Sequence, residues 1–291
     1  MDPLDLVHGD TVLTLAPWIG GGVTRLAWRG LDILRPATPE TLEAGNRLGL
    51  GNFPMVPFAG RVTDGRFNFK GRAIFLPPNL AGETDAIHGQ GWGGAWRAAE
   101  HDAATARLVF DHAAGDWPWT YRAEQTFALE NKALTHTLAV TNTSETPMPA
   151  GLGLHPYFPR DADTRLEADV SGVHLSASDP PTPLPAAWDW RHGRAITAFV
   201  DHQFAGWDGV ARITWPARDL SVRITCDAAT SWLVVYAPTG RDNVCVEPVS
   251  HRLDAVNLSP GGEGYGMVVL APGETTSMTV RFDWNTPHAT T

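Results

Sequence analysis

The sequence has few cysteines and no long apolar segment. Its 291 residues include two cysteines, Cys226 and Cys245, and no CxxC pair, so a disulfide framework is excluded and we expect two buried thiols rather than one disulfide. Nowhere do 18 apolar residues follow one another, and the N-terminal stretch MDPLDLVHGD is acidic, without a basic or apolar run. We therefore expect neither a membrane helix nor a signal peptide, and a cytoplasmic location.

Basic stripes and the common catalytic motifs are also missing. The net charge is −10, and the 22 Lys and Arg residues are scattered, so we expect neither nucleic acid nor an anionic membrane as a partner. The chain has no HExxH pattern, no P-loop lysine after its glycine-rich stretches and no GxSxG elbow. These absences argue against the commonest zinc, nucleotide and serine hydrolase sites, and we expect no metal and no cofactor.

Amphipathic helix patterns are almost absent, and the recurring period is two. Apolar and polar residues alternate over 134–140, 211–215, 220–226 and 278–284, which is typical of strands with one buried face. One short helix is predicted over 38–45, with a glycine as its stop. Many short strands separated by Gly and Pro predict an all-β fold, a large antiparallel β-sandwich.

The chain length permits either two ordinary domains or one large β domain. The proline-rich segment 178–190 has the composition of a linker, but strand patterns resume after it at the same density. We therefore predict a single domain over 1–291, with 178–190 as a long surface loop that could cover a binding cleft.

Two polar residues lie in irregular segments where the strand pattern does not require them. Arg61 follows an apolar run just before a turn, where its guanidinium could bind two hydroxyl oxygens of one ligand, although a surface ion pair is the commoner arrangement. His88 has glycines beside it and Trp92 and Trp96 nearby. Aromatic faces beside a polar donor suit a sugar; a structural histidine with two core tryptophans fits equally well.

Two further ionisable residues each precede a proline. In GLGLHPYF, Pro156 is expected to end a strand and to direct the His155 side chain out of the sheet edge. Glu247 closes an apolar alternation before Pro248, so we expect a carboxylate at a second strand end. The alternatives are a core histidine and a salt bridge between Glu247 and Arg252.

Five segments occur in a characteristic order, each weak as a motif by itself: PMVPFAGRVTDGRF, IHGQGWGGAW, GLGLHPYF, DHQF and CVEPVSHRLDAVN. In this order the sequence resembles the aldose 1-epimerase (galactose mutarotase-like) family, and most closely its bacterial branch. The segments extend from residue 52 to residue 257, so the resemblance covers nearly the whole chain. One departure is Gly60, where family members commonly have Asn before the arginine, which removes a polar contact.

The resemblance implies a galactose mutarotase-like supersandwich with a monosaccharide in an open cleft on one sheet. Carried over by position, it makes His155 the general acid and Glu247 the general base. It makes Arg61, His88 and Asp201 the residues that bind and orient the sugar hydroxyls.

The residue types suit the reaction that the resemblance implies. Interconversion of α and β pyranoses needs a base at the C1 hydroxyl and an acid at the ring oxygen, and the two roles exchange when the ring closes again. An imidazole already titrates near neutral pH, whereas a glutamate needs partial burial to raise its pKa, as the apolar flank NVCVEP suggests.

Two alternatives remain beside this interpretation. A sugar-binding sandwich without catalysis would keep the cleft but would not need an acid and a base. An epimerase of a sugar phosphate would place arginines around the phosphate, and Arg61 is the one arginine that the motifs tie to the site.

Overall fold

The computed structural model describes residues 2–227 and 232–287. In this part of the chain the largest sheet has nine antiparallel strands in the order β10-β11-β12-β13-β26-β22-β21-β17-β19. Their bounds are β10 Arg97–His101, β11 Thr105–His112, β12 Tyr121–Glu130, β13 Ala133–Asn142, β26 Thr275–Asn285, β22 Leu220–Cys226, β21 Val210–Trp215, β17 Arg165–Ala168 and β19 Arg194–Ala195.

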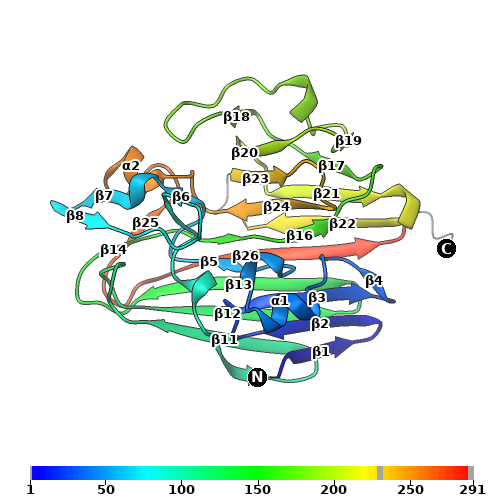
Figure 1. Ribbon diagram of the computed structural model, residues 1–291, viewed down its shortest axis with the longest axis horizontal. Helices are drawn as coiled ribbons and strands as arrows, with labels where there is room; N and C mark the ends of the chain where they lie inside the picture. Colours follow the sequence, from blue (N-terminus) through cyan, green and yellow to red (C-terminus); the bar gives the residue numbers. More distant parts are fainter. Residues whose placement is uncertain (1, 228–231, 288–291) are drawn as a thin grey trace.

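A second sheet carries the candidate site. Its strand order is β18-β20-β23-β24-β15-β5, and β16 also pairs with β24; Figure 1 shows β20, β23 and β24 side by side. The bounds are β18 Gly172–His174, β20 Val200–Ala205, β23 Trp232–Ala237, β24 Asn243–Val249, β15 Gly153–Leu154, β5 Pro54–Met55 and β16 Tyr157–Pro159.

Shorter elements complete the described chain. A four-stranded sheet contains β1 Leu4–His8, β2 Thr11–Ala16, β3 Gly22–Trp28 and β4 Leu31–Asp32. The two-stranded pairs are β14 Met148–Ala150 with β25 Val268–Leu270, β6 Arg61–Val62 with β9 Ala86–Ile87, and β7 Arg66–Phe69 with β8 Arg72–Phe75. The helices are α1 Pro39–Glu43 and α2 Ala255–Leu258, with 3-10 turns η1 Arg47–Gly49, η2 Thr63–Gly65, η3 Gly91–Gly93, η4 Ala186–Trp188, η5 Pro216–Arg218 and η6 Pro260–Gly262.

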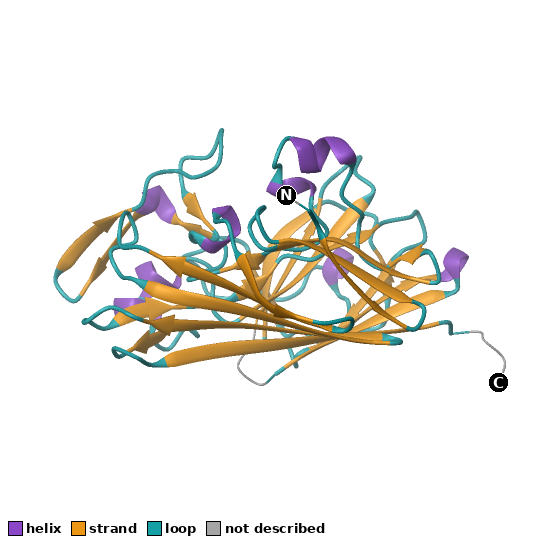
Figure 2. Ribbon diagram, turned by 90° about the horizontal axis from the view of Figure 1, so that it is seen from below, coloured by secondary structure: helices purple, strands orange, loops and turns teal. Residues whose placement is uncertain are grey.

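The period-two patterns form the predicted strands, and the all-β fold is confirmed. Burial alternates along β12, β13 and β26, because one face of these strands packs on the core while the other faces solvent. Figure 2 shows the long strands as a curved layer, with the helices on one side of it. No helix among the described residues is long and apolar enough to cross a membrane.

The predicted short helix is present as α1. Thr38 is its N-cap and accepts a hydrogen bond from the Thr41 amide, while Gly45 has the positive φ of a helix stop. The segment 178–190 is a loop with one short turn, η4, and is tied to β18 by paired backbone hydrogen bonds between Val173 and Thr182.

A buried polar network connects the large sheet to the segment that leads into the site. His136 on β13 bonds Gln125 on β12 through Nε2 and lies 3.4 Å from the Asn52 amide at Nδ1, and Gln125 donates to the Gly21 carbonyl. Burial lowers the pKa of His136 to about 3, so the ring is neutral and can serve both neighbours. The network therefore holds Asn52 in place immediately before Phe53, whose ring packs against His155.

Candidate active site

One cavity of about 610 Å³ brings the five predicted site residues together. Arg61, His88, His155, Asp201 and Glu247 all line it, although they come from segments spread over almost 190 residues of the chain. The volume lies within the range of about 300–1,000 Å³ that is typical of small-molecule sites. The loop 178–190 contributes no lining residue, so it does not form part of the wall.

His155 and Glu247 face each other across neighbouring strands. Gly153 on β15 is paired with Val249 on β24, and the same antiparallel register, continued by two residues, places His155 opposite Glu247. Their side chains meet with 3.4 Å between His155 Nε2 and Glu247 Oε1. Both are buried, at 7% and 4% exposure, so the pair is shielded from bulk water at the base of the cavity.

The predicted strand end is correct for His155 and wrong for Glu247. His155 and Pro156 lie in the gap between β15 and β16, whereas Glu247 lies inside β24, which continues through Pro248 to Val249. The interruption is therefore in the neighbouring strand, where Pro156 provides no N–H donor to the ladder. A proline after an ionisable residue does not show which of two adjacent strands is broken.

Glu247 also does not form the alternative salt bridge with Arg252. The Arg252 guanidinium donates instead to the backbone carbonyls of Ala177 and Asp179, at the start of the proline-rich loop. Arg252 thus anchors this loop, and the ion-pair contact of Glu247 within the described residues is with His155.

Two aromatic rings hold the imidazole of His155. The ring centroids of Phe53 and Tyr157 lie 4.6 Å and 4.7 Å from the centroid of His155, and the Tyr157 ring is nearly parallel to it. The His155 amide donates to the Phe53 carbonyl at 3.1 Å. Nδ1 of His155 has no hydrogen-bond partner among the described residues, so stacking, rather than a second hydrogen bond, sets the orientation of the ring.

The pKa values of the two residues shift in opposite directions. Burial, followed by the charge of Arg35, lowers the pKa of His155 from 6.5 to about 3. Burial, followed by the negative charge of Asp201, raises the pKa of Glu247 well above 4.5. The expected rise for Glu247 is confirmed, whereas the expectation of a near-neutral imidazole pKa is wrong, because the stacking rings exclude water. Between these two pKa values the pair holds one proton.

His88 presents a donor to the cavity. The Gly60 amide donates to His88 Nδ1 at 3.2 Å, so the neutral ring carries its proton on Nε2. Burial, followed by the charges of His155 and Arg61, lowers the pKa of His88 well below 6.5. Trp92 and Trp96 do not line the cavity; both are core residues, which corrects the expectation that their faces could contact a sugar.

Arg61 forms the ion pair that the sequence left open as one alternative. Its guanidinium binds both oxygens of Glu83, at 3.3 Å and 3.0 Å, and this ion pair forms part of the cavity wall. Asp201 lies on β20 opposite Tyr236 of β23, with its side chain exposed to the cavity. The polar end of the cavity therefore offers a cation with free N–H groups and a carboxylate within one wall.

The structure explains the glycine at position 60. Gly60 has a φ of +69°, and a Cβ atom built there would lie 2.2 Å from Cδ2 of Leu253. Leu253 also lines the cavity, so an apolar side chain occupies the space toward which an Asn at position 60 would point. An Asn at position 60 would therefore collide with Leu253 in this chain.

Sequence patterns missed several cavity residues. These are Arg35, Tyr157, Tyr236, Arg241 and Asn243. Tyr157 was present in the HPYF motif, and Asn243 lies on the same face of β24 as Glu247 by the period of two. Arg35 and Arg241 carried no sequence signal, so the expectation that Arg61 is the one arginine tied to the site is wrong.

The two cysteines are buried thiols that are not joined in a disulfide, as predicted. Cys245 lies beside the catalytic candidates, and its Sγ, a His155 nitrogen and a Glu247 oxygen lie within 4.8 Å of one another. These three residues could hold a metal ion. Burial raises the pKa of the Cys245 thiol well above 9, however, so a cation would first have to displace that proton.

Comparison with known proteins identifies the family of the chain. The family model described as aldose 1-epimerase matches residues 4–283. The chain is 33% identical to the uncharacterized protein YphB of Escherichia coli (strain K12), over 96% of this chain and 98% of that protein.

Solved structures give the same fold. A crystal structure of a putative aldose 1-epimerase from Escherichia coli K12 superposes with a TM-score of 0.89 at 30% identity, covering 98% of this chain and 99% of that one. A galactose 1-epimerase from Lactobacillus acidophilus NCFM has a TM-score of 0.78 at 18% identity, with 99% and 96% covered, and this likeness concerns the fold alone.

Proposed function

The chain belongs to the aldose 1-epimerase family, and from this premise we propose that it interconverts the α and β anomers of a free monosaccharide. The observation that carries the proposal is the buried pair of His155 and Glu247, 3.4 Å apart at the base of the cavity. A protein that only bound a sugar would have no need to bury an imidazole beside a carboxylate. Such burial costs free energy that catalysis explains.

The single proton of the pair matches the demands of ring opening. Glu247 takes the proton of the C1 hydroxyl, and His155 gives a proton to the ring oxygen; both oxygens are bonded to the same carbon. In the free protein the pKa directions place the shared proton on Glu247. A sugar hydroxyl that donates to Glu247 stabilises its carboxylate form, and the proton then resides on His155.

The C1–C2 bond of the open aldehyde rotates, and the ring closes on the other face with the two roles exchanged. His155 then removes the proton from the C5 hydroxyl and Glu247 returns one to the new C1 hydroxyl. His88 donates to a sugar hydroxyl through Nε2–H, while Arg61 and Asp201 bind further hydroxyls. The residues thus assemble as one acid, one base and three orienting groups.

Polarimetry of freshly dissolved α-D-glucose, α-D-galactose and several pentoses tests the proposal. The wild-type protein is expected to accelerate mutarotation of at least one of them. His155→Asn should lower the turnover number by about 10²- to 10⁴-fold, because one general acid is lost. His101→Asn, on the exposed strand β10, is the matched control.

Two outcomes would contradict the proposal. A His155→Asn protein as active as the wild type would remove the proposed acid, provided that circular dichroism shows the same fold. A wild-type protein that binds aldoses but accelerates none of them would favour the non-catalytic sugar-binding alternative.

A further inference from the structure

Three different metal-ligating groups meet at the base of the cavity. Cys245 and Glu247 lie two residues apart on β24, so the period of two places both side chains on the same face of the sheet. His155 lies opposite Glu247 in the neighbouring strand, and one donor atom of each of the three residues lies within 4.8 Å of the other two. All three side chains are buried, and a cation would reach Cys245 past the other two, which line the cavity.

The spacing of the donor atoms suits zinc. Zinc is usually tetrahedral, with its ligands at about 2.3 Å for sulfur and about 2.0–2.2 Å for nitrogen and oxygen. Two nitrogen or oxygen ligands of such a tetrahedron are about 3.4 Å apart, and His155 Nε2 and Glu247 Oε1 are 3.4 Å apart. This separation exceeds the roughly 2.7–3.2 Å of an ordinary N–H···O hydrogen bond. A zinc ion would therefore fit between the two atoms as they stand, and Cys245 Sγ would approach by about 1 Å.

The charges around the group suit a divalent cation. A thiolate, a carboxylate and a neutral imidazole together carry two negative charges, which balance Zn²⁺. Burial raises the pKa of Glu247 first; among the charges, Asp201, which raises this pKa, acts more strongly than Arg61, which lowers it. After burial, Glu247 raises the pKa of Cys245 more strongly than Arg35 lowers it. Negative charge therefore predominates around these donors, and it favours a bound cation.

The surroundings of His155 indicate a reversible inhibitor rather than a resident cofactor. Histidines that hold a resident metal almost always donate their second ring N–H to a carboxylate, a carbonyl or water. Nδ1 of His155 has no hydrogen-bond partner among the described residues. An ion bound to Nε2 of His155 and Oε1 of Glu247 would also occupy the proposed acid and base together, so ring opening would stop while the ion stays bound.

We propose that His155, Cys245 and Glu247 bind Zn²⁺ in competition with the sugar, and that the bound ion inhibits the protein. Bonds form from Zn²⁺ to Sγ, Nε2 and Oε1, the protons of the thiol and the carboxyl group pass to water, and no oxidation state changes. Water from the cavity is the fourth ligand. The metal site is independent of the proposed function, whereas the inhibition rests on it.

Metal binding is measured first, on the untagged chain. Calorimetric titration with Zn²⁺ is expected to show a site that Cys245→Ala weakens about 100-fold or more, since losing an outer-shell partner alone costs about 10- to 100-fold. Co²⁺ in place of Zn²⁺ should give the near-ultraviolet charge-transfer band of a cobalt-bound thiolate, and Cys245→Ala should abolish it. Cys226→Ala removes the other buried thiol and is the matched control, which should change neither result.

Inhibition is then measured by polarimetry with the best aldose. Zn²⁺ should raise KM and leave kcat unchanged, and EDTA should restore the rate. Cys245→Ala is expected to be as active as the wild type without zinc, because the thiol takes no part in the proposed proton transfers. It should need about 100-fold more Zn²⁺ for the same inhibition. Mg²⁺ prefers oxygen ligands and should not inhibit.

Equal zinc inhibition of the wild type and Cys245→Ala would overturn the inference, because other histidines and carboxylates would then account for it. Inhibition that lowers kcat and leaves KM unchanged would overturn the competition with the sugar. The proposed function can fail separately: if no sugar is turned over, the cobalt spectrum still decides about the metal site. A thiolate band that Cys245→Ala abolishes would support the site, and a wild-type spectrum without that band would overturn it.

Discussion

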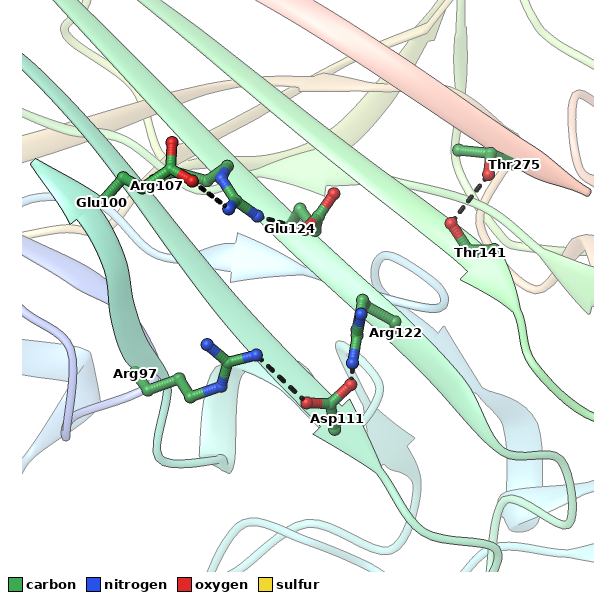
Figure 3. A network of polar contacts seen from close by, with 8 residues as sticks. All are labelled: Arg97, Glu100, Arg107, Asp111, Arg122, Glu124, Thr141 and Thr275. Carbon is green, nitrogen blue, oxygen red and sulfur yellow. Dashed lines mark hydrogen bonds and ion pairs between the residues drawn. The ribbon is translucent and has the colours of Figure 1, made fainter. Parts of the chain in front are cut away.

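Charged side chains are arranged differently on the outer face of the large sheet and in the cavity. On the outer face, Arg107 of β11 reaches Glu100 of β10 and Glu124 of β12, at 2.7 Å and 2.8 Å. Asp111 of β11 similarly lies between two arginines, and Figure 3 shows both groups crossing three neighbouring strands. Each of these charges is exposed or half-exposed and has an opposite charge beside it.

In the cavity the ionisable groups are arranged differently. Arg61 is paired with Glu83, whereas Glu247 is 4% exposed and faces His155, whose lowered pKa leaves its imidazole neutral at ordinary pH. Surface charges thus pair with one another across neighbouring strands, whereas the cavity buries an ionisable pair with shifted pKa values, which is typical of a functional site.

The largest effect on turnover is expected for Glu247 in the cavity, compared with Glu124 on the outer face of the large sheet. Glu247→Gln should lower the turnover number for the best aldose by about 10²- to 10⁴-fold, because the amide cannot accept the C1 proton. Glu124→Gln removes a carboxylate from the outer face and should leave turnover unchanged. Polarimetry measures the turnover number of both variants. Similar losses in the two would contradict the role of Glu247 as the general base.

A smaller effect is expected for the two arginines with carboxylate partners. Arg61→Ala should raise KM by about tenfold or more while kcat falls less, because Arg61 is proposed to bind hydroxyls in both ground and transition states. Arg122→Ala, whose partner is the exposed Asp111, should change neither. Initial rates over a range of sugar concentrations give both constants. A fall in kcat larger than the rise in KM would assign Arg61 to the transition state.

The pH profile of kcat/KM should reflect the opposite pKa shifts of His155 and Glu247. The one-proton form exists above the His155 pKa of about 3 and below the raised pKa of Glu247. Activity is therefore expected to stay level from about pH 5 up to the raised pKa of Glu247 and to fall above that pKa, as the last proton is lost. If His155 kept its ordinary pKa of 6.5, activity would instead fall above pH 6.5.

Asp201→Asn sharpens this prediction. The Asp201 carboxylate raises the pKa of Glu247, so its removal should move the alkaline fall to lower pH. Asp111→Asn on the outer face should not move it. A shift to higher pH in Asp201→Asn would contradict the assignment of the alkaline limb to Glu247.

The smallest effect is expected within the outer face itself. In a double-mutant cycle of Arg107→Ala and Glu124→Ala, the coupling should change the midpoint of thermal unfolding by about 2 °C or less and should fade in molar salt. Calorimetric scans at low and high salt measure it. A large, salt-independent coupling would mean that these exposed pairs behave like buried ones.

Much of the fold followed from local pattern. Alternation over 134–140, 211–215 and 278–284 became β13, β21 and β26, because a half-buried strand places every second residue on the core. The motifs also named five residues that share one cavity. Their roles in catalysis and binding are still predictions that the proposed variants address.

Other features had no local signal. The break between β15 and β16 sits opposite Glu247, so the proline after Glu247 was misinterpreted as the end of its own strand. Arg35 reaches the site through packing on Tyr157, more than 120 residues away in the chain. Nothing in the neighbourhood of either residue in the sequence indicates that contact.

The sequence by itself determined the strand pattern, the short helix, the buried thiols and the residue types of an acid and base pair, because each depends on neighbours within a few positions. Only the tertiary structure decided which strand is interrupted, that His155 lies between Phe53 and Tyr157, and that Arg35 and Arg241 share its cavity. The reason is physical: a contact and a pKa depend on what surrounds a group in space.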